Sequence, residues 1–427
     1  MEHLLHYVWK HKLFPLKILQ TTKGLLVEII DSGLQNPDAG PDFFNAKLKI
    51  DGTLWVGNIE IHTHSSDWYR HGHDHDKTYD SVILHVVAEA DAEVTRSNGE
   101  QIPQLLFTFP ENVQTHYHEL CIADQYPACY SIISSLSKLT IHSWLTALQT
   151  ERLEQKARQI TERLERCDRH WEDAFFITLA RNFGFGLNGD AFETWAGMLP
   201  FRAIDKHRND LFQIEAFFYG LAGLLEDSFL KKGQEDEYSL RLIKEFRYLQ
   251  RKFEFTQVMN ATLWRFLRLR PENFPTVRLA QLAYLYQRGG KLFSRLLEAG
   301  TLAEVRTLLE VGTSSYWESH YLFGRTSSQK KKTMGERSKD LIIINTVVPF
   351  LYTYGLHKAN EGMCERAGRF LEELKAEDNH IIRSWSAAGL PVVSAADSQA
   401  LIQLQKEYCD RRKCLYCRFG YEYLRHK

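Results

Sequence analysis

Hydrophobic and polar positions change their spacing along the chain near residue 130. Before this point apolar residues alternate with polar ones in short segments, a pattern that is typical of strands. It predicts helices over residues 4–12 and between 74 and 80, and strands at 25–30, 42–50, 54–64, 81–94 and 104–109. We therefore expect an N-terminal α/β module built on a curved or mixed sheet.

Beyond residue 130 the apolar positions recur every three or four residues, which predicts helices almost throughout. A long amphipathic helix begins near Ile141, and its Glu and Arg residues form a solvated face. Further helices are expected at 214–225, 240–253, 278–287, 341–356, 361–375 and 398–408. The expected fold class is α+β, with an α/β domain over residues 1–130 and a large all-α domain over residues 131–427.

The composition is typical of a globular protein of the cytoplasm. Hydrophobic residues make up 44% of the 427 positions, and at roughly 100 to 200 residues per domain this length fits two domains. The chain does not open with a secretion signal, and its apolar runs fall far short of the ~20 residues that cross a bilayer. Lys plus Arg (53) nearly balances Asp plus Glu (54), so a polyanion must be bound by a local basic patch.

Two acidic residues flank the turn predicted at Asp51-Gly52. This dipeptide favours a tight turn between the strands at 42–50 and 54–64. Asp42 and Glu60 lie nine residues from Asp51 on either side, so they should face each other across the two strands. Two carboxylates repel unless a cation lies between them, and Mg²⁺ or Mn²⁺ held in this way keeps positions open for water and a phosphate.

The segment GPDFFNAKLKIDGTLWVGNIEIHTHSSDW, residues 40–68, resembles the PD-(D/E)XK nuclease superfamily. The resemblance rests on Pro-Asp at 41–42 and Glu-Ile-His at 60–62, and it covers roughly the first hundred residues. It implies a restriction-endonuclease-like order of helix, three strands, helix and strand, with the two acids as metal ligands. His62 then stands where the superfamily has a lysine, as a base, as a third ligand or as the mark of an inactive relative.

Histidines are concentrated in the same region, with nine of the 18 in the first 85 residues. His62 and His64 alternate with Glu60, and His71-Gly-His73-Asp-His75 follows. Imidazoles with carboxylates bind zinc, iron or nickel, so a metallohydrolase that uses His62, His64 and one of these is an alternative. Alternating polar residues on a strand also commonly face water, and a broken run of histidines on a loop is commonly exposed. The expected accessory residues are His64, Glu2 and His85, of which His85 also suits the core.

Seven cysteines, an odd number, do not suit a secreted disulfide framework. Cys409, Cys414 and Cys417 are spaced so that their thiolates can converge on one ion or cluster. Cys364 is the expected fourth ligand of Zn²⁺ or a [4Fe–4S] cluster. Some PD-(D/E)XK nucleases carry a similar four-cysteine iron–sulfur site with a different inner spacing, and the alternative is inert buried cysteine.

Basic residues recur at three- and four-residue steps on the helix expected at 240–253, and others lie beside the C-terminal cysteines. They are Arg241, Lys244, Arg247, Arg251, Arg411 and Arg412. Such residues can neutralise phosphates, so nucleic acid is the expected partner, although a solvated helix face gives the same pattern.

The whole chain, from HYVWKHKLF to SQALIQLQKEYCDRRKCLYCRFG, also resembles a bacterial family recorded as a domain of unknown function, which implies no activity. The residues therefore predict a metal-dependent phosphodiesterase that acts on DNA or RNA. One alternative is a non-catalytic nucleic-acid-binding or scaffold protein with a degenerate nuclease fold. The other is the His/carboxylate metallohydrolase.

Overall fold

The chain forms two compact units in the computed structural model. The structure describes residues 2–13, 19–36, 38–107, 111–123, 127–230, 235–288 and 290–425. The first unit comprises Met1–Trp144, Ser384–Leu390 and Leu404–Lys427, and the second comprises Leu145–Arg383 and Pro391–Gln403. The C-terminal segment therefore belongs with the N-terminal module, whereas the division expected from the sequence assigned it to the helical domain.

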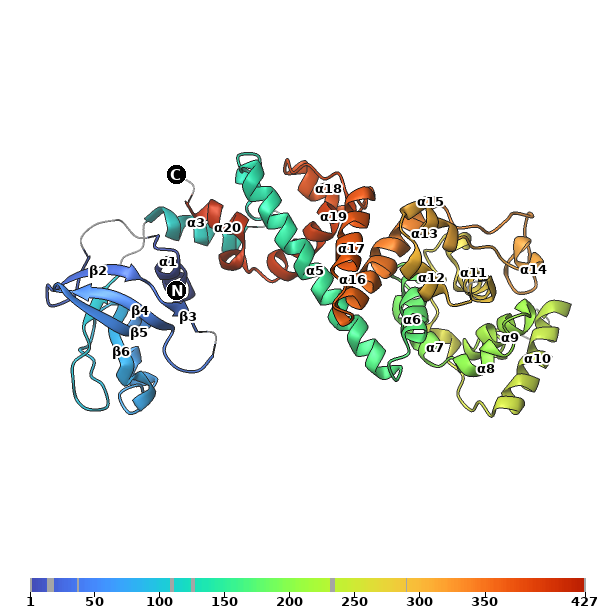
Figure 1. The fold of residues 1–427 in the computed structure, drawn as a ribbon, viewed down its shortest axis with the longest axis horizontal. Coiled ribbons are helices and arrows are strands. Elements are labelled where there is room, and N and C mark those ends of the chain that lie inside the picture. The colour runs from blue at the N-terminus through green and yellow to red at the C-terminus, as the bar shows by residue number, and fades with distance from the viewer. Residues whose placement is uncertain are drawn as a thin grey trace. The chain divides into compact units, whose positions relative to one another are not determined.

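A seven-stranded mixed sheet is the framework of the first unit (Figure 1). Its strands are β1 (Leu19–Gln20), β2 (Leu26–Asp31), β3 (Leu34–Gln35), β4 (Phe43–Ile50), β5 (Thr53–His64), β6 (Val82–Glu89) and β7 (Gln104–Leu106). The order is β1-β2-β4-β5-β6-β7, with β3 beside β4. Pairing is antiparallel as far as β5 and parallel from β5 to β7, which confirms the mixed sheet. The strand expected at 104–109 is shorter, and its residues 108 and 109 lie outside the described residues.

The hairpin between β4 and β5 forms as the sequence predicts. Asp51 and Gly52 have φ values of 48° and 82°, and two central residues with positive φ match the right-handed twist of the strands. β4 alternates buried and exposed residues over much of its length, so only one of its faces meets the core. β6 is buried from Val82 to Val87, which is typical of a parallel strand covered on both faces.

The two edges of the sheet meet at a seam next to β1 and β7. Thr21 pairs with Leu105 in an antiparallel bridge, and the Thr22 N–H donates to the Gln104 carbonyl at 2.8 Å. These contacts occupy edge groups that an open sheet leaves unpaired. The sheet is therefore closed in the manner of a barrel at this point.

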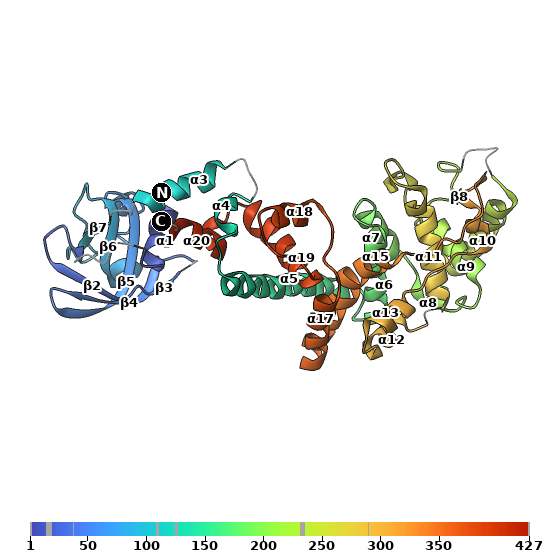
Figure 2. The same cartoon turned by 90° about the horizontal axis from the view of Figure 1, so that it is seen from above.

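Helices complete the first unit at both ends of the sheet. α1 (Glu2–Lys10) contacts β5, and the short helix α2 (Asp67–Arg70) with a 3₁₀ helix at Lys77–Ser81 joins β5 to β6. α20 (Arg418–Arg425) contacts both α3 (Glu111–Ile122) and α4 (Tyr130–Ile133), as Figure 2 shows for α3. The last helix of the chain is thus part of the N-terminal unit.

The second unit is largely helical, which confirms the α+β class. Its helices are α5 (Lys138–Arg166, which begins in the first unit), α6 (Trp171–Phe183), α7 (Gly189–Gly197), α8 (Phe201–Asp205), α9 (Leu211–Leu221), α10 (Glu237–Phe253), α11 (Pro275–Arg288), α12 (Leu292–Glu298), α13 (Leu302–Leu308), α14 (Ser315–Glu318), α15 (Glu336–Ile342), α16 (Val348–His357), α17 (Glu361–Glu373), α18 (His380–Ala387, shared with the first unit) and α19 (Ala395–Gln403). They enclose one large apolar core, and a short hairpin, β8 (His320–Leu322) with β9 (Arg325–Thr326), lies beside them.

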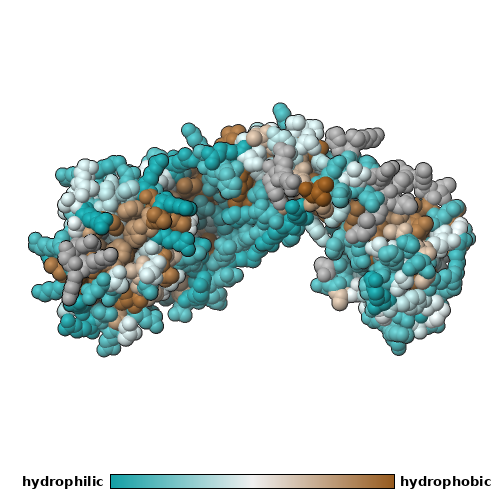
Figure 3. Space-filling view, turned by 180° about the vertical axis from the view of Figure 1, so that it is seen from behind, coloured by the Kyte–Doolittle hydropathy of each residue, from teal (hydrophilic) through white to brown (hydrophobic). Residues whose placement is uncertain are grey.

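The described helices are all too short or too polar to cross a bilayer. Hydrophilic residues also cover most of the face drawn in Figure 3, with hydrophobic residues scattered among them.

Candidate metal centre

The two predicted acids lie side by side where β4 begins. The Asp42 N–H donates to Glu60 Oε2 at 3.1 Å, and the Ile61 N–H donates to Asp42 Oδ2 at 2.9 Å. Each carboxylate therefore accepts a hydrogen bond from the backbone of the other strand. One oxygen of Glu60 remains, and this buried oxygen faces a group of histidines.

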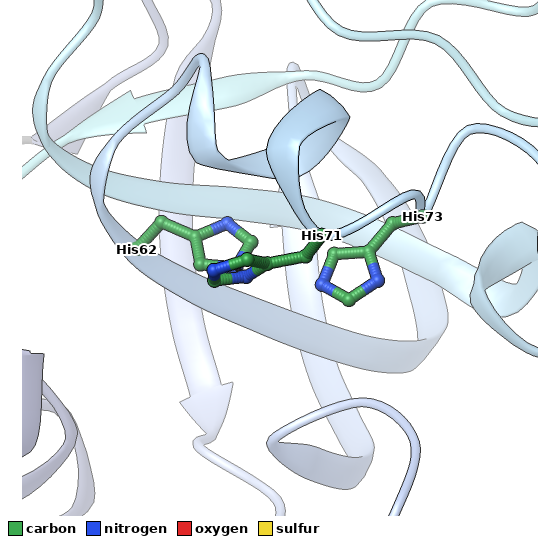
Figure 4. A group of neighbouring side chains, drawn as sticks. All are labelled: His62, His71 and His73. Atoms are coloured by element: carbon green, nitrogen blue, oxygen red, sulfur yellow. Dashed lines mark hydrogen bonds between the residues drawn. The ribbon is translucent and has the colours of Figure 1, made fainter.

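Three imidazoles converge beside Glu60, and Figure 4 shows them pointing toward one another. His62 lies in β5, while His71 and His73 follow α2 directly. One ligand nitrogen of each residue lies within 4.8 Å of the other two. His62 and His73 are buried, whereas His71 is exposed. The group is therefore enclosed on one side and open to solvent at His71.

Three distances between donor atoms of Glu60 and the histidines match the distance between neighbouring ligands of one ion. Glu60 Oε1 lies 3.4 Å from His62 Nε2 and 3.3 Å from His73 Nε2, and His62 Nε2 lies 3.2 Å from His71 Nδ1. Bonds of about 2.0 to 2.1 Å in a tetrahedral site place the ligand atoms about 3.3 Å apart. His73 Nε2 is also buried without a hydrogen-bond partner among the described residues, as expected of a nitrogen reserved for a ligand.

A shell of buried side chains fixes the orientation of these imidazoles. His85 in β6 is fully buried and shares a 2.9 Å hydrogen bond with His62 Nδ1, which leaves His62 Nε2 toward Glu60. Tyr79 stacks on His73 with ring centroids 3.8 Å apart, and Trp68 packs edge-on against the same ring. His85 thus acts on the site through His62, in the way that outer residues orient metal-ligating histidines.

His6 on α1 pairs with Asp42, and the sequence alone did not predict this histidine as a site residue. Its Nε2 lies 3.2 Å from Asp42 Oδ2. Burial alone would lower the pKa of His6, but the hydrogen bond and charge of Asp42, with a contribution from the charge of Glu2, raise it above its usual value. Glu2, one of the predicted accessory acids, therefore acts here through its charge.

Burial sets the charge of the remaining groups. It raises the pKa of Glu60 to about 9, and the neighbouring charge of Asp42 adds to this effect. Burial, together with the neighbouring histidines, lowers the pKa of His62 to about 2 and that of His85 to about 3. Neutral imidazoles are the form that binds metals, and a cation would offset the repulsion between the two acids.

The ligand set differs from both sets that the sequence suggested. His64, expected with His62, is about half exposed and lies 3.5 Å from Glu89. His75 is 88% exposed. The described donors are therefore imidazole-rich, which favours zinc, iron or nickel over the Mg²⁺ or Mn²⁺ expected for two carboxylates. The clue in the sequence was the His71-x-His73 spacing, because both histidines reach the end of β5 once α2 turns the chain back.

The cysteine set expected from the sequence is not assembled. Cys364 belongs to the second unit, where its thiol donates to the Tyr352 carbonyl at 3.6 Å, while Cys409, Cys414 and Cys417 belong to the first. Among the described residues, no three cysteine sulfurs lie within 4.8 Å of one another. The C-terminal cysteines are thus not clustered around one ion.

The basic residues divide into two groups. Arg241, Lys244, Arg247 and Arg251 are exposed on α10, on the face opposite its buried Leu242, Phe246 and Leu249. By contrast, Arg411 pairs with Glu407 at 3.0 Å, and Arg412 donates to the Cys121 carbonyl. Both groups are exposed, but among the described residues the α10 group forms no ion pair with an acidic side chain, whereas Arg411 does.

Comparison with known proteins identifies the family of the chain. A family model described as a protein of unknown function, DUF2851, matches residues 2–380. The chain belongs to the DUF2851 family. No curated protein and no solved structure matches it. These comparisons give no evidence for the PD-(D/E)XK superfamily, so that resemblance stays a prediction. The DUF2851 match spans every residue of the candidate metal centre and ends before Cys409.

Proposed function

We propose that the first unit is a metal-dependent hydrolase. Its ion is held by the imidazoles of His62, His71 and His73, with the Glu60 carboxylate beside two of them, and this set leaves the fourth position of a tetrahedral site for water. The observation that carries this proposal is that one ligand nitrogen of each imidazole lies within 4.8 Å of the other two, while Glu60 Oε1 lies 3.4 Å from His62 Nε2 and 3.3 Å from His73 Nε2. His73 Nε2 is buried beside Glu60 Oε1 at 3.3 Å and forms no hydrogen bond with the described residues, so it is available to a ligand.

The surroundings of the ligands suit hydrolysis. A substrate can reach the ion from the side of His71, which is exposed, whereas His62 and His73 are buried. A bound ion supplies a water acidic enough to attack near neutral pH. His6 stays protonated more readily than an ordinary histidine because Asp42 holds it, so it can donate a proton to the leaving oxygen.

Phosphodiester bonds of DNA or RNA are the substrate class that we infer. When the two-residue strands β1 and β3 are set aside, the order of α1, the antiparallel strands β2, β4 and β5, the short helix α2 and the parallel strand β6 agrees with the order implied by the PD-(D/E)XK resemblance. In the second unit, Lys244, Arg247 and Arg251 form no ion pair with the described acidic side chains. Cations free of acidic partners can neutralise the phosphates of a nucleic acid.

The test is cleavage of labelled single- and double-stranded DNA and RNA by the full chain. Chelator-treated protein receives Mn²⁺, Zn²⁺ or Mg²⁺ in turn, and we expect cleavage with a transition metal. Glu60→Gln and His73→Ala should abolish it, while His75→Ala, on the same loop but 88% exposed, should retain it. Cleavage that persists in Glu60→Gln would assign the activity elsewhere.

The same experiment separates the non-catalytic alternative. Binding that weakens steeply with salt, without cleavage under any metal, indicates a nucleic-acid-binding protein with a degenerate site. Metal binding by the wild type, measured by calorimetry and lost in His73→Ala, tests the ion site independently of any substrate.

A further inference from the structure

A second site in the first unit brings together four cysteines from distant parts of the chain. Cys129 caps the start of α4, Cys409 ends a π-helical segment, Cys414 begins a 3₁₀ helix and Cys417 precedes α20. All four line one small cavity of about 20 Å³. Cys129, and not the expected Cys364, is thus the fourth cysteine at this cavity.

The backbone around this cavity is held in place by specific contacts. A Cβ on Gly420 would lie 2.1 Å from the Cys414 carbonyl oxygen, so only glycine lets α20 approach this turn. The Arg412 side chain donates to the Cys121 carbonyl, which ties the loop between Cys409 and Cys414 to α3. The cysteines therefore surround the cavity in a fixed arrangement.

Burial raises the pKa of the Cys417 thiol, and the backbone groups beside it act in the opposite direction. Its carbonyl accepts the Tyr421 N–H at 2.8 Å, so it stands at the N-terminus of α20. The backbone amides of Phe419 and Gly420 form hydrogen bonds with its sulfur. Amide donors and a helix N-terminus both stabilise a negatively charged sulfur.

The sulfurs lie too far apart for a single zinc ion to bind them as they stand. Around one zinc ion, bonds of about 2.3 Å would bring the four sulfurs about 3.8 Å from one another. No three sulfurs of the described cysteines lie within even 4.8 Å of one another. An iron–sulfur cluster spreads its four cysteine ligands over several irons, so the ligands stand farther apart. Most of the remaining wall is apolar or aromatic, with Leu120 and Trp385 among its residues, and such a wall shields a cluster from water.

We propose that these four thiolates bind an iron–sulfur cluster. The site is separate from the proposed hydrolytic centre and does not depend on its activity. The cluster links Cys129 to the segment that begins 280 residues later at Cys409, and so fixes the end of the chain to the N-terminal unit. Its role is structural, because its ligands come from the start of α4, the end of the π-helical segment, the start of the 3₁₀ helix and the residue before α20.

The experiment measures iron and acid-labile sulfide in the full chain, purified without oxygen or reconstituted with ferrous iron and sulfide. We expect equal amounts of iron and sulfide, two or four of each per chain, with a broad visible absorption. Cys129→Ser should lose most of the iron, and Cys364→Ser should retain it. Zinc without sulfide, iron retained by Cys129→Ser, or a wild type that takes up no iron would each overturn the proposal.

A second measurement keeps the test decisive if a variant fails to fold. Wild-type protein is alkylated before and after a chelator removes the metal, and the modified cysteines are identified by mass spectrometry. We expect the reactivity of Cys409 and Cys414 to rise after chelation, while that of Cys167 and Cys364 stays the same. Equal reactivity of Cys409 and Cys414 before and after chelation would show that they bind no metal.

Discussion

Glu215 in α9 gives the second unit a pH-dependent stability that a single substitution should remove. Its carboxyl is fully buried, and its Oε2 accepts hydrogen bonds from the hydroxyls of Tyr238 and, at 3.2 Å, Ser314. Its Oε1 has no partner among the described residues. Burial raises the pKa of Glu215 from 4.5 to about 7, against the opposing effect of the two hydroxyls.

The raised pKa means that the folded chain holds a proton that the unfolded chain releases. The contribution of Glu215 to the free energy of unfolding is therefore complete below about pH 4.5 and is lost as the pH rises to about 7. At about 1.36 kcal/mol per pKa unit, the loss amounts to roughly 3 kcal/mol. Glu215→Gln cannot ionise, so the variant should gain about 3 kcal/mol relative to wild type between about pH 4.5 and about pH 8.

Urea unfolding of the full chain at these two pH values measures the difference. The glutamine amide can destabilise the variant by a constant amount, because Glu215 Oε1 has no hydrogen-bond partner among the described residues. This amount is the same at both pH values, so it cancels when the two differences in the free energy of unfolding are compared. Glu226→Gln, at an exposed glutamate of the same unit, is the matched control and should leave the pH dependence unchanged. If Glu215→Gln differs from wild type by the same amount at both values, the carboxyl is not held neutral by burial and the reasoning fails.

Three further predictions test the packing and the basic face. Gly223→Ala should destabilise the chain by more than about 2 kcal/mol, since the new Cβ would lie 2.0 Å from a carbonyl oxygen, whereas Gly186→Ala, with positive φ but open space, should cost about 1 kcal/mol in thermal melts. Trp68→Ala should cost roughly 3 to 5 kcal/mol and also weaken metal binding in calorimetry, because the indole packs against two histidines of the site. Lys244→Glu with Arg247→Glu should weaken nucleic-acid binding and flatten its salt dependence, and unchanged filter binding would remove α10 from the interface.

The sheet was predictable because its local signals agree with its tertiary contacts. Asp51-Gly52 adopts the positive φ values that the turn needs, and β4 and β5 begin and end within a residue or so of the predicted limits. The unit boundaries were harder to foresee. α20 returns to α3 from the far end of the chain, and no local pattern records a contact between segments that are some 300 residues apart in sequence.

The site was predictable only in part. Asp42, Glu60 and His62 meet because strand register fixes which residues are neighbours. His6, on another element, required the packing of α1 on β5 to be known. The sequence likewise did not predict that Cys129 and Cys409 line one cavity, because only the three-dimensional fold of the first unit brings them together.

The seam between Thr21 and Leu105 limits how the first unit can be shortened. A truncated chain that begins after residue 22 would lack β1 and the residues that pair with β7. The backbone amides and carbonyls at that edge of the sheet would then be free to pair with strands of other molecules. Fragments that start at β2 should therefore self-associate and precipitate, even though every residue of the proposed hydrolytic centre except His6 would still be present.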